Sequence, residues 1–98
     1  MYGTIARIKV RKDKVREFFA LGKEWDDRER KRAYGYLGSE VLWEDREAGC
    51  ACLVVHFSSK ESYLANANSP EQDAFYRKLR ACLDADPEWI DGEWKGYW

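Results

Sequence analysis

The stretch Ser69-Pro70-Glu71-Gln72-Asp73-Ala74-Phe75-Tyr76 carries a complete set of signals for the start of a helix. Ser69 can cap the helix, and Pro70 suits the first helical position, where a missing N–H costs nothing. Gln72 lies three residues after the cap and can reach back to close a capping box. Acidic side chains in the first turn favour the positive end of the helix dipole. We therefore expect a helix over residues 70–84.

The segments outside this helix alternate between strand and helix patterns. Residues 2–10 alternate apolar and charged side chains, which predicts a strand with one buried face. Residues 50–57 are more densely apolar, as is typical of a strand inside a sheet. Further strands are expected over residues 36–44 and 90–98, and a short helix capped by Ser59 is expected over residues 60–67.

A long helix is expected after the first strand, because apolar side chains recur there at helical spacing. Its predicted buried stripe consists of Val15, Phe18, Phe19, Gly22 and Trp25. Residues 26–32 are almost wholly charged, and pairs such as Asp26–Arg30 have the favourable i,i+4 order with the acid first. This charged run predicts a solvated helix face, with a docking surface as the lesser alternative.

The expected order of elements is β-α-β-β-α-β, with the second helix broken in two. This order predicts an α+β, ferredoxin-like fold with a four-stranded antiparallel sheet. The 98 residues form a single domain, residues 1–98, with no room for a second core. Both helical segments must cover one face of the sheet, so the other face is bare unless a partner covers it. A homodimer would supply that cover.

Composition excludes several classes of function. With 17 Lys and Arg against 18 Asp and Glu, the net charge of −1 gives no electrostatic footprint for nucleic acid or an anionic membrane. The longest apolar run, Cys50–Val55, is too short to span a bilayer, and we expect no signal peptide. Three cysteines are an odd number, which does not suggest a disulfide framework. We expect a cytoplasmic protein with reduced thiols.

Several segments together resemble one protein family over nearly the whole chain. The matching pieces are Ile5–Val10 followed by Asp13-Lys14, then Gly35–Ser39, then Glu61–Asp73, and finally Asp86–Trp89. They are similar to the antibiotic-biosynthesis-monooxygenase-like (ABM) family of dimeric α/β barrels. The resemblance specifies fold and dimer better than activity, because this fold hosts many reactions.

The resemblance implies two sheets packed face to face across a two-fold axis, with a pocket inside each subunit between sheet and helices. In cofactor-independent oxygenases of this kind, polar and aromatic side chains orient a phenolic or quinol-like substrate, whose own carbanion reduces oxygen. No cofactor is implied. The haem-degrading branch has an Asn, a Trp and a His where this chain has Ala6, Asn66 or Ala67, and Tyr76. We therefore do not expect haem degradation.

Tyr63, Asn66 and Tyr76 are the candidate catalytic residues. A Tyr hydroxyl and an Asn amide could hold a substrate oxygen or stabilise developing oxyanion character. The alternative is structural: Asn66 and Asn68 would shape the helix break, and the Tyr rings would pack with their hydroxyls at the surface. The residues alone favour the structural alternative.

Cys50, Cys52 and His56 share one face of a strand, which on paper suggests a metal site. Residues two apart on a flat strand stand nearly 7 Å apart, at about 3.3 Å per residue, so one ion could not readily gather all three. We expect no metal. His56 is expected to face the barrel or the subunit interface, and the sequence identifies no carboxylate that could orient it. Arg7 and Lys9 are expected to pair with Glu40, Glu44 or Glu93 across neighbouring strands or the dimer, with anion binding inside the barrel as the lesser alternative.

Two functions remain open from the sequence. The first is a cofactor-independent monooxygenase acting on a small aromatic or polyketide-type compound. The second is a non-catalytic homodimeric module that binds a small ligand or serves a stress or regulatory role. In either case Trp94 and Trp98 are predicted to extend the subunit contact.

Overall fold

The computed structural model, which describes residues 1–96, contains four strands and three α-helices. The sequence patterns predicted each of these elements, although the last strand begins and ends earlier than expected and the third helix ends at Ala81. In chain order the elements are β1 (Tyr2–Lys9), the short 3-10 helix η1 (Lys12–Lys14), α1 (Val15–Arg32), β2 (Tyr36–Asp45), β3 (Cys50–Phe57), α2 (Lys60–Ala67), α3 (Pro70–Ala81) and β4 (Glu88–Glu93).

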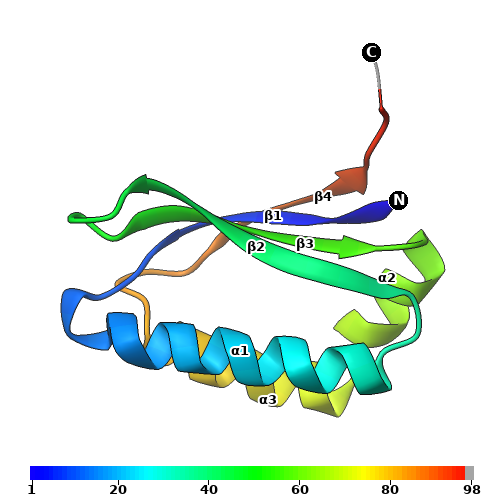
Figure 1. Cartoon of the computed structure of the whole chain (residues 1–98), viewed down its shortest axis with the longest axis horizontal. Helices are drawn as coiled ribbons and strands as arrows, with labels where there is room; N and C mark the ends of the chain where they lie inside the picture. The colour runs from blue at the N-terminus through cyan, green and yellow to red at the C-terminus, as the bar shows by residue number, and fades with distance from the viewer. Residues whose placement is uncertain (97–98) are drawn as a thin grey trace.

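The strands form one antiparallel sheet in the order β2-β3-β1-β4. Figure 1 shows α1 and α3 side by side beneath one face of this sheet, with α2 at its end. The other face carries no helix, and the chain after β4 leaves on that side. The predicted α+β, ferredoxin-like fold is therefore confirmed. Among residues 1–96, no helix has both the length and the apolar content needed to cross a membrane.

The two faces of the sheet differ because successive side chains of a strand point to opposite sides. Toward the helices, Ala6 and Ile8 of β1 and Ala51 and Phe57 of β3 are buried in the core. We call the other side the open face. It carries residues that pair across the strands, such as Ile5 with Ile90, and Ile90 remains 69% exposed.

The buried stripe of α1 differs from the predicted one. Leu21 lies in the core between Phe18 and Trp25, whereas Gly22 is exposed. Phe19 is 43% exposed and packs against Trp43 at the rim, with ring centroids 5.8 Å apart. The spacing of apolar residues alone could not distinguish the two stripes, because both lie at helical intervals.

The charged end of α1 is not wholly solvated, which corrects the prediction for residues 26–32. Glu29 is fully buried, and its two carboxylate oxygens accept hydrogen bonds from Arg32 Nη2 at 2.9 and 2.7 Å. Arg28 Nη2 lies 3.6 Å from the same carboxylate. A buried charge is tolerated only when it is paired, so these arginines hold the end of α1 in place. The predicted Asp26–Arg30 ion pair is present at 2.9 Å.

The helix start at Ser69 is confirmed, but its capping box is not. Ser69 Oγ accepts a hydrogen bond from the backbone N–H of Gln72 at 3.1 Å. The Gln72 side chain does not return to the cap, because it is engaged with Trp25 of α1 instead. A reciprocal capping box forms at the start of α2, between Ser59 and Ser62.

Replacing Glu29 with Ala should lower the free energy of unfolding by about 2 kcal/mol, because hydrogen bonds to charged groups contribute about 1.5–3 kcal/mol. Urea unfolding measures the change. Asp27→Ala is the matched control on the same helix. It removes an exposed pair with Lys23, and such pairs contribute about 0–1 kcal/mol. Equal losses in the two variants would contradict a structural role for the buried carboxylate.

Candidate functional site

A pocket of about 560 Å³ lies between the helices and the covered face of the sheet. Side chains of all four strands and all three α-helices contribute to its wall. Eight aromatic side chains line it: Phe18, Phe19, Trp25, Phe57, Tyr63, Phe75, Tyr76 and Trp89. Ligand sites are typically concave, mostly apolar and supplied with a few polar groups, and this pocket fits that description.

Across β1, β3 and β2, one row of paired residues presents short side chains to the pocket. Thr4 of β1 and Ser39 of β2 face it, and Val55 of β3 lies between them. Thr4 is 3% exposed, and its hydroxyl donates to the Ile90 carbonyl of β4 at 3.2 Å. These small inward residues leave open space under the aromatic rings of α1 and α3.

Tyr63 of α2 lies in the wall of the pocket, and its hydroxyl forms a hydrogen bond with a residue of β4. The hydroxyl donates to Asp91 Oδ1 at 3.0 Å, and the ring packs on Phe57 with centroids 5.7 Å apart. Burial and, second, the hydrogen bond to Asp91 raise the pKa of Tyr63 to about 12. Tyr63 is therefore a protonated phenol at neutral pH, and it can act as a hydrogen-bond donor.

Asn66 of α2 is buried in the same wall, at 8% exposure. Its Oδ1 accepts from Arg32 Nη2 at 2.6 Å, and its Nδ2 donates to Gln72 Oε1 at 3.4 Å. One of the two N–H groups on Nδ2 is used by the Gln72 contact, which leaves the second for another acceptor. Asn66 thus joins α1, α2 and α3 at one end of the pocket.

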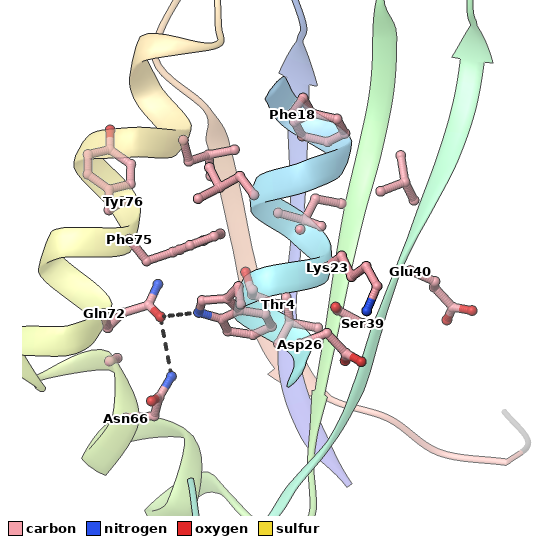
Figure 2. Close-up of a pocket in the computed structure, with 18 of the residues that line it drawn as sticks. Thr4, Phe18, Lys23, Asp26, Ser39, Glu40, Asn66, Gln72, Phe75 and Tyr76 are labelled. Atoms are coloured by element: carbon pink, nitrogen blue, oxygen red, sulfur yellow. Dashed lines mark hydrogen bonds between the residues drawn. The ribbon is translucent and has the colours of Figure 1, made fainter. Parts of the chain in front are cut away.

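Tyr76 of α3 is half-buried and also lines the pocket. Its ring faces that of Trp89 on β4, with centroids 6.4 Å apart. Figure 2 shows its hydroxyl directed away from Gln72 and Asn66. The structure therefore brings Tyr63, Asn66 and Tyr76 to one pocket, but it does not bring their polar atoms to one point.

Sequence analysis missed two polar groups in the pocket wall, those of Gln72 and Asp26. Gln72 Oε1 accepts from the indole N–H of Trp25 at 3.2 Å. Burial alone would raise the pKa of Asp26, but hydrogen bonds from Tyr36 and Arg30 hold it below its usual value. The same contact with Asp26, after burial, raises the pKa of Tyr36. The i,i+4 spacing predicts the Asp26–Arg30 pair but not its place in a pocket wall. The contact between Gln72 and Trp25 joins residues 47 apart along the chain, so no local motif marks it.

His56 lies on the open face, away from the pocket. Glu40 of β2 supplies the carboxylate that the sequence did not identify, with Oε1 3.0 Å from His56 Nε2. The His56 ring also packs against Trp94 at a tilt of 46°, with centroids 4.5 Å apart. Of the three acidic partners expected for Arg7, the structure shows Glu44, whose Oε1 lies 3.5 Å from Arg7 Nε across the intervening strand β3.

The cysteines and His56 do not form a recognisable metal centre in the described part of the chain. Cys50, Cys52 and Cys82 are all free thiols. Within residues 1–96, no three side chains of His, Cys, Asp or Glu are grouped so that they could hold a metal ion.

Helices on one face of a four-stranded sheet, with an aromatic pocket between the two layers, define the class of two-layer α+β proteins to which this chain belongs. The sequence profile of one family, described as antibiotic biosynthesis monooxygenase, matches residues 1–78. The chain belongs to this family. No curated protein sequence matches the chain.

Solved structures have the same fold. A conserved protein from Methanosarcina mazei superposes with a TM-score of 0.77 at 20% identity, covering 96% of this chain and 92% of that one. A protein from Mycobacterium tuberculosis gives 0.76 at 17% identity, covering 98% and 96%. A structure described as antibiotic biosynthesis monooxygenase gives 0.75 at 9% identity, covering 97% and 99%. At these identities the similarity concerns the fold alone.

The raised pKa of Tyr63 predicts a specific loss of stability at alkaline pH. The folded chain favours the protonated phenol, so this stabilisation is fully present below the unfolded-state pKa of about 10. It is lost as the pH rises from about 10 to about 12. The difference in unfolding free energy between the wild type and Tyr63→Phe should therefore be constant below about pH 9 and shrink above about pH 10.

Chemical denaturation at a series of pH values measures this difference. Tyr34→Phe is the control, because Tyr34 is 89% exposed and its replacement should give a flat difference. A Tyr63→Phe difference that is equally flat would show that the hydroxyl has no protected environment.

Proposed function

We propose that this chain binds a small aromatic compound in the pocket and oxidises it with molecular oxygen, as a cofactor-independent monooxygenase. The observation that supports the proposal most directly is the pocket of about 560 Å³ with eight aromatic side chains in its wall. Aromatic rings favour stacked or edge-on contacts with a planar ligand. The description of the family supplies the reaction class.

The proposed reaction takes its electrons from the substrate. A substrate with an activated CH₂ group, such as an anthrone, loses a proton to give a carbanion, and the carbanion reduces O₂. The products are a carbonyl and water, so that CH₂ and O₂ become C=O and H₂O. The protein must accept the proton, hold the substrate oxygen that carries negative charge, and exclude bulk water.

Tyr63, Asn66 and Tyr76 are the proposed catalytic residues. The Tyr63 hydroxyl can accept the substrate proton while it passes its own proton to Asp91, 3.0 Å away, and so remains neutral throughout. The second N–H of Asn66 can stabilise a substrate oxyanion. Tyr76 would orient the aromatic ring of the substrate beside Trp89.

A second candidate function is binding without reaction. It is favoured by the fact that the polar atoms of Tyr63 and Asn66 already have partners within the protein. Polar groups that already form hydrogen bonds within the protein, in the absence of a ligand, are typical of a structural network. In this alternative the chain is a ligand-binding or regulatory module with the same pocket.

We also propose that the open face of the sheet is covered by a second copy of the chain. Leu42 and Ile90 on this face are 63% and 69% exposed, which is a large apolar area to leave in water. Trp94, which packs against His56, would extend the contact. Trp98, predicted for the same role, lies outside the described residues. The three free thiols suit a reducing, cytoplasmic location.

Oxygen uptake with a panel of anthrones and hydroquinones tests the proposed reaction. Tyr63→Phe, Asn66→Ala and Tyr76→Phe should each lower the rate about tenfold or more, because positioned proton-transfer groups contribute about 10²–10⁴-fold. Tyr34→Phe, on the exposed surface, should leave the rate unchanged. Uptake that is flat across the panel, together with ligand-induced melting shifts that persist in all variants, would support the binding module instead.

Sedimentation velocity over a dilution series tests the proposed dimer. Ile90→Lys, and Trp94→Ala combined with Trp98→Ala, should each shift the chain toward monomer at micromolar concentration. Leu64→Lys is the matched control, because Leu64 is 43% exposed but lies on α2, away from the open face. A wild-type chain that sediments as a folded monomer throughout would rule out the second copy.

A further inference from the structure

The side-chain amide of Gln72 has a fixed direction, although the two ends of an amide look alike in shape. An amide oxygen accepts hydrogen bonds and an amide nitrogen donates them, so partners that can only donate decide which end is which. Two donor-only groups of α1 fix the direction of the Gln72 amide: Trp25 contacts it directly, and Arg32 acts through Asn66 of α2. Figure 2 shows both contacts converging on the Gln72 oxygen.

The first control comes from Arg32 at the end of α1. A guanidinium carries donors only, so the atom of Asn66 that lies 2.6 Å from Arg32 Nη2 must be its oxygen. The nitrogen of Asn66 is then the atom that faces Gln72. Because that nitrogen donates, it must meet the oxygen of Gln72.

The second control is the indole of Trp25. Its N–H can only donate, and it lies 3.2 Å from the same Gln72 oxygen. Trp25 is in the middle of α1 and does not depend on Asn66. Two independent donors therefore hold the Gln72 oxygen, and the amide nitrogen with its two N–H groups is turned the other way.

Glu29 anchors this arrangement at its far end. Its buried carboxylate holds Arg32 through contacts of 2.9 and 2.7 Å. The guanidinium therefore cannot rotate away from Asn66 without breaking both of these hydrogen bonds to a buried charge, which is costly. A series of hydrogen bonds thus runs from the end of α1 to the wall of the pocket and fixes the direction of the Gln72 amide. Its members are Glu29, Arg32, Asn66 and Gln72.

The nitrogen of Gln72 remains available. Gln72 is partly exposed and lines the pocket, and among the described residues its Nε2 donates to no protein acceptor. Figure 2 shows this nitrogen on the side of Phe75, away from Asn66. A free N–H in a wall of aromatic rings is a strong recognition element, because leaving it unpaired beside a bound ligand is costly.

We propose that Gln72 Nε2 is the hydrogen-bond donor that recognises the ligand, and that the ligand must present an acceptor oxygen to it, as an aromatic ketone or a phenolate does. The proposal rests on the proposed binding of an aromatic compound in this pocket. Gln72 selects the ligand, and Asn66, Arg32 and Glu29 are positioning residues that hold the Gln72 amide in the selective direction. A hydrocarbon of the same shape leaves the N–H groups unpaired and is rejected.

Isothermal titration calorimetry with 1-tetralone and tetralin tests the selection. The two probes share one ring skeleton, and only the ketone has an acceptor oxygen. The wild-type chain should bind 1-tetralone at least about tenfold more tightly than tetralin, since the loss of one matched hydrogen bond has an effect of this order.

Gln72→Glu should abolish this preference, because a carboxylate has no donor to offer the ketone. The fold should tolerate the change, since the carboxylate still accepts from Trp25 and Asn66, and Glu is favourable in the first turn of α3. Affinity for tetralin should stay within about twofold. Glu24→Gln, an exposed residue of α1 that lies outside the pocket wall, is the control and should retain the full preference for the ketone.

Asn66→Asp tests the positioning residues separately. One oxygen of the new carboxylate can still accept a hydrogen bond from Arg32. The other oxygen replaces the Asn66 nitrogen and faces the Gln72 oxygen, so two acceptors meet and the present orientation of the Gln72 amide is disfavoured. The ratio of ketone to hydrocarbon affinity should fall, and the side-chain ¹⁵N–¹H resonances of Gln72 should shift. A role for Asn66 in stability alone would leave that ratio unchanged.

The outcomes separate this inference from the proposed function. Binding of neither probe by the wild type would overturn the aromatic pocket itself, and the inference with it. Equal binding of both probes, or a preference that survives in Gln72→Glu, would overturn the role of Gln72 while the pocket stands. Loss of preference in Gln72→Glu, with tetralin binding intact, would support it.

Discussion

The buried carboxylate of Glu29 connects the end of α1 to the junction between α2 and α3. A charge in this position is tolerable only because Arg32 meets it with short hydrogen bonds. The same guanidinium reaches Asn66, so that a single ion pair sets the spacing of three helices at one end of the pocket. The positions of the polar groups in the candidate site therefore depend on the ion pair between Glu29 and Arg32.

The two faces of the sheet have different surroundings. Period-two alternation sends Thr4 and Val55 toward the helices and Ile5 and Ile90 toward the open face. The covered face holds the pocket, and the open face leaves the apolar side chain of Ile90 exposed. Glu40 of β2 connects the two regions, because it lines the pocket and also contacts His56 on the open face.

Most of the helices and strands could be predicted from local sequence signals. Each of these signals depends only on residues close to it in the sequence. They are the cap at Ser59, the cap and proline at Ser69 and Pro70, and the dense apolar run of residues 50–57. Such signals survive in any context, and the structure has an element at each of them. The family pattern also directed attention to Tyr63, Asn66 and Tyr76, and all three lie in the wall of one pocket.

The sequence by itself determined the order of the elements, their approximate bounds and the existence of a covered and an uncovered sheet face, because caps and periodicity are properties of neighbouring residues. Only the tertiary structure decided that Glu29 is buried and that Gln72 turns from its own cap to Trp25. Both facts depend on how the helices pack. The partner of Glu29, Arg32, is only three residues away, but packing decides that this pair is buried. Trp25 and Gln72 are 47 residues apart along the chain. A polar side chain can form hydrogen bonds with several different partners, and the packing of the helices determines which partner is within hydrogen-bond distance.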